Sequence, residues 1–367
     1  MKGRQLFNRY LGALPALLAL LSTAPVMAQS LEEMAGQMIV VGFVGDDLSD
    51  ASVQAVLGEL RAGDIGGVMY LKPNVKNRGA VTEMNAAFRA ASPDLPPFIT
   101  LDQEGGAVER LTEAVGFKEV PNAATVAERY SPDAAGRLYA DMAEGIAAWG
   151  FDVNFAPVVD LSINPDNQVI ARFGRAFSAD PGTVADYATE VIAAHHAHGL
   201  LTALKHFPGH GSSTADSHEG FVDITRSFRP EELEPYAQLI DGGYADMVMM
   251  GHLIDTNVDP SGLPASLSAP WIEGELRGNL GFKGVVITDD LEMGAIRQHF
   301  ELDETVTRAV RAGVDVLLFS NTAEPRGSLG DEVRAIIMAE AERDPDFRAR
   351  VEASYARIVA LKARIGQ

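Results

Sequence analysis

The stretch Lys205–His218, which reads KHFPGHGSSTADSH, combines one lysine, three histidines and one aspartate. A proline and two glycines in this stretch disfavour a helix or a strand, so we expect a loop. Asp216 precedes His218 by two positions. A carboxylate so placed can hold an imidazole in one tautomer and raise its basicity, and a histidine that titrates near neutrality can give and then take a proton. The segment therefore predicts an acid/base pair on a loop.

A second candidate is the pair Asp289 and Asp290, which directly follows the apolar run Val285–Thr288. A carboxylate at the end of a strand can act as a nucleophile toward an anomeric carbon. Aspartate is also favoured as the N-cap of a helix. Because there are two aspartates, one can react while the other caps a helix or orients its neighbour.

A third candidate is the stretch LDQEGG, in which Asp102 follows an apolar run and Arg110 comes eight positions later. A carboxylate and a guanidinium can hold sugar hydroxyls through bidentate hydrogen bonds. By itself this motif has little specificity.

The elements that must position these residues are visible as short apolar runs, each followed by polar residues and then often by a segment with helical periodicity. Eight runs recur, at residues 38–43, 67–71, 98–101, 151–158, 200–205, 247–251, 285–288 and 314–319. The clearest amphipathic stretches are 134–149, 183–198, 231–240 and 304–312. Eight β-then-α units predict the α/β class and a single (β/α)8 TIM-type barrel. An open Rossmann-like sheet is the alternative, but no glycine-rich dinucleotide turn follows the first run.

A barrel requires its chemistry to lie where each strand ends and its loop begins. The polar residues of this chain meet that requirement at six of the runs, which end at Asp102, Asp160, Lys205-His206, His252, Asp289-Asp290 and Ser320-Asn321. We therefore expect one active-site face.

Composition excludes several function classes. The chain has 367 residues and a formal net charge of −21, which argues against nucleic acid as a partner. It contains no cysteine, so disulfides, thiolate catalysis and cysteine-based zinc sites are excluded.

The first 28 residues predict a cleavable signal peptide. Lys2, Arg4 and Arg9 form a basic start, an apolar core spans Leu11–Leu21, and small residues precede a cleavage position after Ala28. An uncleaved membrane anchor is the alternative. We expect an exported protein, periplasmic or secreted, without stable membrane insertion after cleavage.

Four segments in this order, LDQEGGAVERL, GRAFSADP, KHFPGHGSSTADSH and ITDDLEMGA, resemble glycoside hydrolase family 3, specifically its β-N-acetylhexosaminidase branch. The resemblance runs from about residue 31 to the end, so residues 29–367 are expected to form one catalytic barrel. It implies that Asp289 is the nucleophile and that Asp216 and His218 form the acid/base dyad. The sugar-contacting positions that it implies are Asp102, Arg110, Arg175, Lys205 and His206.

The sequence departs from the family pattern at Ala107, where an arginine often follows E-G-G, so a contact beside the substrate is in doubt. Arg172 also competes with Arg175 for one expected role, and we choose Arg175 because GRAFSADP keeps the family spacing. The signal peptide is a further departure, since the Gram-negative peptidoglycan-recycling members are cytoplasmic.

The resemblance implies hydrolysis of terminal β-linked N-acetylglucosamine with retention, through a covalent glycosyl-enzyme, on cell-wall fragments or chitin-type oligosaccharides. No metal or organic cofactor is expected, and the partner is a small oligosaccharide or muropeptide. A phosphorylase that uses the same site is the nearest alternative. A plain β-glucosidase is disfavoured because no second domain with a glutamate acid/base is visible. A different class is an exported metal- or solute-binding barrel, with His206, His210, Asp216 and His218 as ligands.

Overall fold

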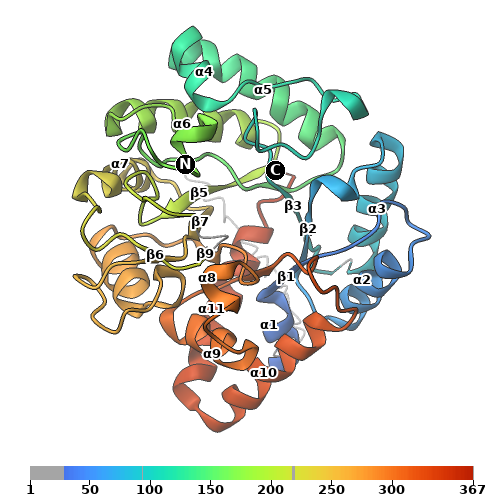
Figure 1. Cartoon of the computed structure of the whole chain (residues 1–367). Coiled ribbons are helices and arrows are strands. Elements are labelled where there is room, and N and C mark those ends of the chain that lie inside the picture. Colours follow the sequence, from blue (N-terminus) through green and yellow to red (C-terminus); the bar gives the residue numbers. More distant parts are fainter. Residues whose placement is uncertain (1–28, 93, 217–219, 367) are drawn as a thin grey trace, which may run out of the picture.

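Eight parallel strands form a closed barrel at the centre of the chain (Figure 1). The computed structural model describes residues 29–92, 94–216 and 220–366. The sheet order is β10-β1-β2-β3-β4-β5-β7-β9. A parallel bridge between Ile287 in β9 and Val316, which directly precedes β10, closes the barrel. The strands are β1 (Ile39–Gly42), β2 (Gly67–Tyr70), β3 (Phe98–Leu101), β4 (Val153–Asn154), β5 (Leu201–Phe207), β7 (Met247–Met250), β9 (Val285–Thr288) and β10 (Leu317–Phe319).

Helices surround the barrel and cover its outer face (Figure 1). They are α1 (Leu31–Gln37), α2 (Ala51–Ala62), α3 (Arg78–Ala91), α4 (Ala123–Arg129), α5 (Pro132–Ala148), α6 (Pro181–His196), α7 (Glu234–Asp241), the π-helix Pro270–Asn279, α8 (Gly294–Arg297), α9 (Leu302–Ala312), α10 (Leu329–Arg343) and α11 (Pro345–Lys362). Two short strands outside the barrel, β6 (Val222–Asp223) and β8 (Leu253–Ile254), pair with each other, and the short turn η4 (Pro230–Leu233) precedes α7.

The predicted barrel is confirmed: each of the eight apolar runs overlaps one barrel strand. The fourth run is the least regular, because β4 has only two residues where eight were predicted. Pro157 lies in that run and has no backbone N–H to continue a ladder. The fifth strand is longer than predicted and extends to Phe207. The helical stretches 134–149, 183–198, 231–240 and 304–312 correspond to α5, α6, η4 with α7, and α9.

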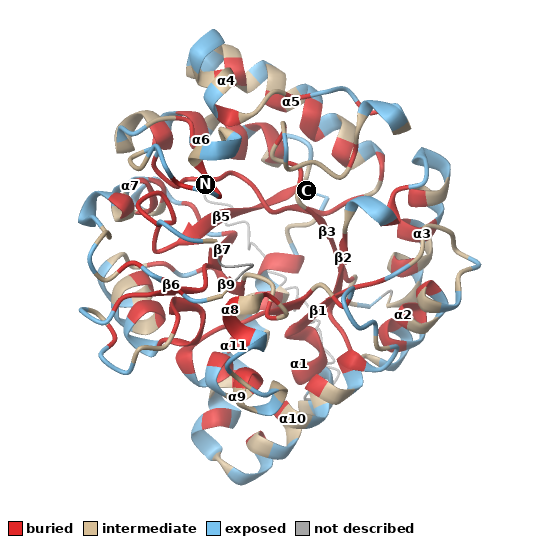
Figure 2. Cartoon of the chain, viewed as in Figure 1, coloured by how far each residue is buried: buried red, intermediate tan, exposed pale blue. Residues whose placement is uncertain are grey.

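Buried residues concentrate on the strands and on the inward faces of the helices (Figure 2). The amino-terminal end of the barrel is closed by Lys362 of α11, which is 4% exposed and donates hydrogen bonds to Gln37 Oε1 and to the carbonyl oxygen of Gly66. Burial lowers the pKa of this lysine to about 7. The active site is therefore expected at the opposite end of the barrel, where the strands have their carboxyl ends.

The predicted signal segment, residues 1–28, lies outside the described residues. Within the described ranges, no helix combines the length and the apolar character needed to cross a bilayer.

Candidate active site

A pocket of about 400 Å³ opens at the carboxyl ends of the barrel strands. Its wall includes six of the eight residues predicted from the sequence: Asp102, Arg110, Arg175, Lys205, His206 and Asp289. They come from segments that follow β3, β4 and β9, or from the end of β5 itself. Side chains from four parts of the chain therefore converge on one cavity, as the barrel requires.

Lys205 is the centre of a charged cluster on one side of the pocket. Its Nζ lies 2.8 Å from Asp102 Oδ1 and 2.6 Å from Glu104 Oε1, and Arg110 Nη2 donates to Asp102 Oδ2 at 2.9 Å. Burial works against the charge on Lys205, but the two carboxylates outweigh it and the pKa of Lys205 is raised. The ammonium group therefore stays charged and directs its donors at oxygen atoms.

Arg175 completes this cluster through a bidentate pair with Glu104. Its Nε donates to Glu104 Oε2 at 2.8 Å and its Nη2 donates to Oε1 at 2.7 Å. Both side chains are nearly buried, with 10% and 7% exposure. Arg172 instead reaches Gln168 and lies against the ring of Phe173. Of the two arginines that competed for the sugar contact, Arg175 is the one in the pocket wall.

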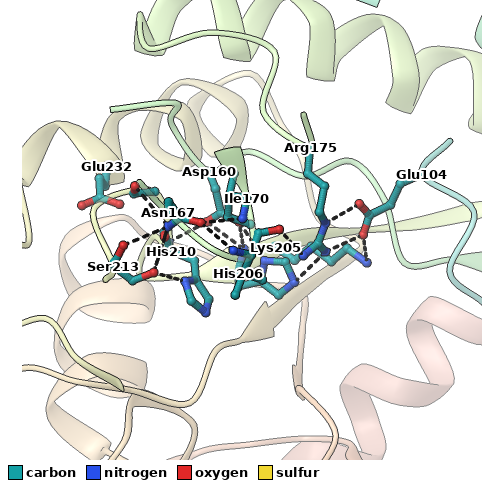
Figure 3. A network of polar contacts seen from close by, with 12 residues as sticks. Glu104, Asp160, Asn167, Ile170, Arg175, Lys205, His206, His210, Ser213 and Glu232 are labelled. Carbon is teal, nitrogen blue, oxygen red and sulfur yellow. Dashed lines mark hydrogen bonds and ion pairs between the residues drawn. The ribbon is translucent and has the colours of Figure 1, made fainter. Parts of the chain in front are cut away.

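Asp160 holds two histidines, one at the end of β5 and one just after it (Figure 3). His206 Nδ1 lies 2.7 Å from Asp160 Oδ2, and the backbone N–H of His210 donates to Asp160 Oδ1 at 2.7 Å. Burial raises the pKa of this carboxyl, but His206 and the hydrogen bonds outweigh burial, so the pKa is lowered overall. The remaining nitrogen of His206 lies 3.4 Å from Arg175 Nη2. Asp160 thus fixes the ring of His206 at the edge of the charged cluster.

Asp289 lies directly after β9 and faces the same pocket. Its backbone N–H donates to the carbonyl oxygen of Met250 at 2.9 Å, and its Oδ1 accepts the N–H of Asp290 at 2.8 Å. Burial raises the pKa of its carboxyl, but His206 and His252 lower it more, and the net shift is downward. The side chain is therefore an anion at neutral pH, as a carboxylate nucleophile must be.

Asp290 differs from its neighbour in both contacts and protonation. Its Oδ1 accepts the N–H groups of Ser320 at 2.8 Å and of Glu292 at 3.1 Å, and burial raises its pKa to about 6. The following helix begins only at Gly294, with Met293 at the N-cap position. Asp290 therefore orders the turn after β9 and does not cap α8, which excludes the helix-capping alternative for this residue.

The acid/base pair is described in part. Asp216 lies in the loop after β5, and His218 lies outside the described residues. Among the residues that the structure does describe, no three histidine, aspartate or glutamate side chains are arranged to hold a metal ion.

Sequence reasoning missed three residues that shape the site: Glu104, Asp160 and His210. Glu104 lies in the same motif as Asp102, and Asp160 follows the fourth apolar run, so both carried a positional signal. His210 was considered only as a metal ligand. What could not be inferred is that Glu104 and Asp160 act as acceptors for Arg175 and His206.

The sequence model of the family described as "Glycosyl hydrolase family 3 N terminal domain" matches residues 30–360. The chain belongs to glycoside hydrolase family 3. As a member of family 3, it is a glycoside hydrolase, and the predicted enzyme class is confirmed.

Two similar proteins carry the name of a glycoside hydrolase, β-hexosaminidase. A protein named "Beta-hexosaminidase" from Xylella fastidiosa (strain 9a5c) is 40% identical over 293 residues, covering 77% of this chain and 82% of that protein. Another of the same name, from Stenotrophomonas maltophilia (strain R551-3), is 37% identical over 290 residues with the same coverage.

Solved structures of family 3 enzymes share the fold. The β-N-acetylglucosaminidase of Paenibacillus sp. str. FPU-7 superposes with a TM-score of 0.83 at 31% identity. That match covers 92% of this chain, which spans 63% of the Paenibacillus chain. The β-N-acetylhexosaminidase of Beutenbergia cavernae DSM 12333 superposes with a TM-score of 0.81 at 30% identity, covering 92% of this chain and 99% of that one. The resemblance to the hexosaminidase branch of family 3 is confirmed.

Proposed function

We propose that this family 3 hydrolase is a retaining β-N-acetylhexosaminidase that removes terminal β-linked N-acetylglucosamine from small oligosaccharides. The observation that carries the proposal is the anionic carboxylate of Asp289, half-buried in a pocket whose lining also includes paired cations and carboxylates. Such a wall suits a neutral, hydroxyl-rich ring, because charged donors and acceptors bind hydroxyls strongly. The relatives named above give the class of sugar.

The reaction has two displacements at the anomeric carbon. In the first, an oxygen of Asp289 attacks this carbon, the glycosidic bond breaks, and the leaving oxygen takes a proton from the imidazolium of His218. In the second, a water molecule gives a proton to His218 and its oxygen attacks the same carbon, which releases the Asp289 carboxylate. Two inversions give net retention. Asp216 holds the imidazole in the tautomer that this exchange needs.

The charged cluster supplies binding and orientation in this scheme. Lys205, Arg110 and Arg175 line the pocket and are themselves held by Asp102 or Glu104. Because these side chains are already fixed before substrate arrives, little side-chain entropy is lost on binding. His206, fixed by Asp160, is placed to contact the same ring.

We also propose that the enzyme is exported and acts on cell-wall fragments or chitin-type oligosaccharides outside the inner membrane. The basic start, apolar core and small-residue exit of residues 1–28 support this. Mass spectrometry of the protein from its native host should find a mature chain that begins near Gln29. A chain that retains Met1 in the cytoplasm would contradict export.

The central experiment is to trap the covalent intermediate. A 2-acetamido-2-deoxy-5-fluoroglucosyl fluoride should glycosylate the enzyme slowly at one carboxylate with release of fluoride, and peptide mapping should locate the sugar on Asp289. An intact unlabelled enzyme that still hydrolyses an aryl β-N-acetylglucosaminide with inversion would reject the mechanism.

The phosphorylase alternative, in which phosphate replaces water in the second displacement, is tested separately. Turnover of an aryl β-N-acetylglucosaminide should be independent of phosphate, with free N-acetylglucosamine as the product. A sugar 1-phosphate as the main product would make the enzyme a phosphorylase. Faster turnover of an aryl β-glucoside than of the aryl β-N-acetylglucosaminide would reject the hexosaminidase assignment.

A further inference from the structure

His210 contributes an unused polar atom to the pocket wall. The residue is 2% exposed, and its Nε2 has no hydrogen-bond partner within the described parts of the chain. Leaving a buried polar atom unpaired is unfavourable, because it loses its hydrogen bonds to water and gains none. Since the side chain lines the pocket, a bound molecule can supply the missing partner.

The other ring nitrogen of His210 is fully engaged. Nδ1 lies 2.5 Å from Ser213 Oγ, and this hydroxyl donates to the carbonyl oxygen of His210 at 2.9 Å. Asn167 Nδ2 also donates to Ser213 Oγ, at 2.9 Å. A hydroxyl has one proton, and the carbonyl oxygen can only accept; we assign the proton to this bond, so that the hydroxyl accepts from Nδ1–H. The ring therefore carries its proton on Nδ1, and Nε2 presents a lone pair.

The environment keeps this ring neutral. Burial lowers the pKa of His210 to about 4 and outweighs the opposite effect of Asp160, and His206 and Arg175 lower it further by smaller amounts. At neutral pH the ring is therefore a neutral imidazole, and Nε2 is an acceptor.

The position of His210 complements that of the cations. In Figure 3, it lies on the side of His206 away from Arg175 and Glu104. The rings of His206 and His210 stand edge to face with centroids 5.9 Å apart, and Asp160 holds both residues. The cations offer donors to sugar oxygens, whereas His210 offers a neutral acceptor beside them.

We propose that Nε2 of His210 accepts a hydrogen bond from one O–H or N–H group of the bound glycon and thereby contributes to sugar specificity. The inference rests on the proposed function, since it takes N-acetylglucosamine as the ring in the pocket. That sugar carries four donors in its ring substituents, namely the amide N–H at C2 and the hydroxyls at C3, C4 and C6. Ser213 and Asn167 act as positioning residues that fix the tautomer.

The test compares wild type with His210→Asn. The asparagine amide can occupy the place of Nδ1 and donate to Ser213, but it has no atom at the place of Nε2. His210→Phe removes both functions and serves as the second variant. Each enzyme is assayed on a parent aryl β-N-acetylglucosaminide and on four analogues that lack one donor each: the 2-O-acetyl, 3-deoxy, 4-deoxy and 6-deoxy compounds.

On the parent, His210→Asn should lower kcat/KM by roughly 2- to 12-fold, the range expected for one neutral hydrogen bond. On one of the four analogues, wild type and His210→Asn should have equal kcat/KM, because neither can make the bond. The electronic effect of each analogue on the reaction cancels in this comparison. Ser213→Ala should show the same dependence on that analogue, with a smaller loss.

Two results would overturn the inference: an equal loss on all five substrates, which is the pattern of a purely structural role, or no loss on the parent. If the thermal unfolding temperature of His210→Asn falls strongly, the ratios between substrates still decide, because a smaller folded fraction lowers all rates by one factor. Failure of the proposed function would look different, since wild type would then not hydrolyse the parent.

Discussion

Lys205 Nζ lies 2.8 Å from Asp102 Oδ1, although the two residues are 103 positions apart in the chain. The same ammonium group lies 2.6 Å from Glu104, and its side chain is 2% exposed. A buried cation between two carboxylates both stabilises the fold and prepares donors for a substrate. Because both roles depend on one atom, removing it should affect stability and binding together.

Lys205→Met should lower the free energy of unfolding by about 3 kcal/mol, because it leaves two buried carboxylates with one cation fewer. The matched control is Lys76→Met, which breaks an exposed pair with Asp47 and should change the free energy of unfolding far less than Lys205→Met does. Urea unfolding at neutral pH measures both. Equal small losses in the two variants would show that Lys205 is not part of a tightly coupled cluster. For the folded variant, we expect a higher KM.

Arg175→Lys should reduce kcat/KM at least about 10-fold, because a lysine cannot reproduce the two parallel hydrogen bonds to Glu104. Arg172→Lys is the control, since the side chain of this arginine reaches Gln168 and the ring of Phe173 and does not line the pocket. Steady-state kinetics on an aryl β-N-acetylglucosaminide compares them. A larger effect at Arg172 would return the sugar contact to that residue.

Glu232, in η4, should make stability depend on pH. Its Oε2 accepts the backbone N–H of Ser212 at 3.1 Å, so it supports the beginning of the loop that leads to Asp216. Burial raises its pKa from 4.5 to about 7, so between these values the folded state binds more protons than the unfolded state. The contribution of this carboxyl to stability is therefore full below about pH 4.5 and is lost as pH rises through 7.

Glu232→Gln removes this titration and keeps an acceptor for Ser212. Relative to wild type, the variant should gain stability between pH 4 and pH 8, by up to about 3 kcal/mol for a shift of this size. Denaturant unfolding across that range measures the difference, and the titration of Glu59, which is also shifted, cancels because both proteins contain it. Parallel curves for the two proteins would contradict the raised pKa.

Much of the fold was visible in the sequence because buried parallel strands leave continuous apolar runs, and each run overlaps one strand. The polar residues at the strand ends predicted which side chains converge, and Asp102, Lys205 and Asp289 share a pocket. Partner choice could not be predicted in this way. The Glu104–Arg175 pair joins positions 71 apart, and it depends on how the segment after β4 returns across the barrel mouth.

Asp289→Ala should abolish turnover on every substrate, with a loss of at least about four orders of magnitude in kcat, because no glycosyl-enzyme can form without the carboxylate. Asp290→Asn should have a much smaller effect, since an amide can still accept the N–H groups of Ser320 and Glu292. Single-turnover kinetics on both variants separates chemistry from product release. An active Asp289→Ala beside an inactive Asp290→Asn would move the nucleophile by one residue.

The roles of His218 and Asp216 can be separated from that of Asp289 by the leaving group. His218→Ala should be mild on substrates with very acidic leaving groups, which depart with little protonation, and severe on an alkyl glycoside. With an acidic leaving group, the first displacement still proceeds, so kcat/KM falls little. The second displacement lacks its base, so the glycosyl-enzyme should accumulate and give a burst of released aglycone. Asp216→Ala should show the same trend more weakly, because it removes the group that orients the imidazole and leaves the imidazole itself. For wild type, Asp216→Ala and His218→Ala, the logarithm of kcat/KM is plotted against the pKa of the leaving group. The slope should be steepest for His218→Ala. Full activity of His218→Ala on an alkyl glycoside would show that another group transfers the proton.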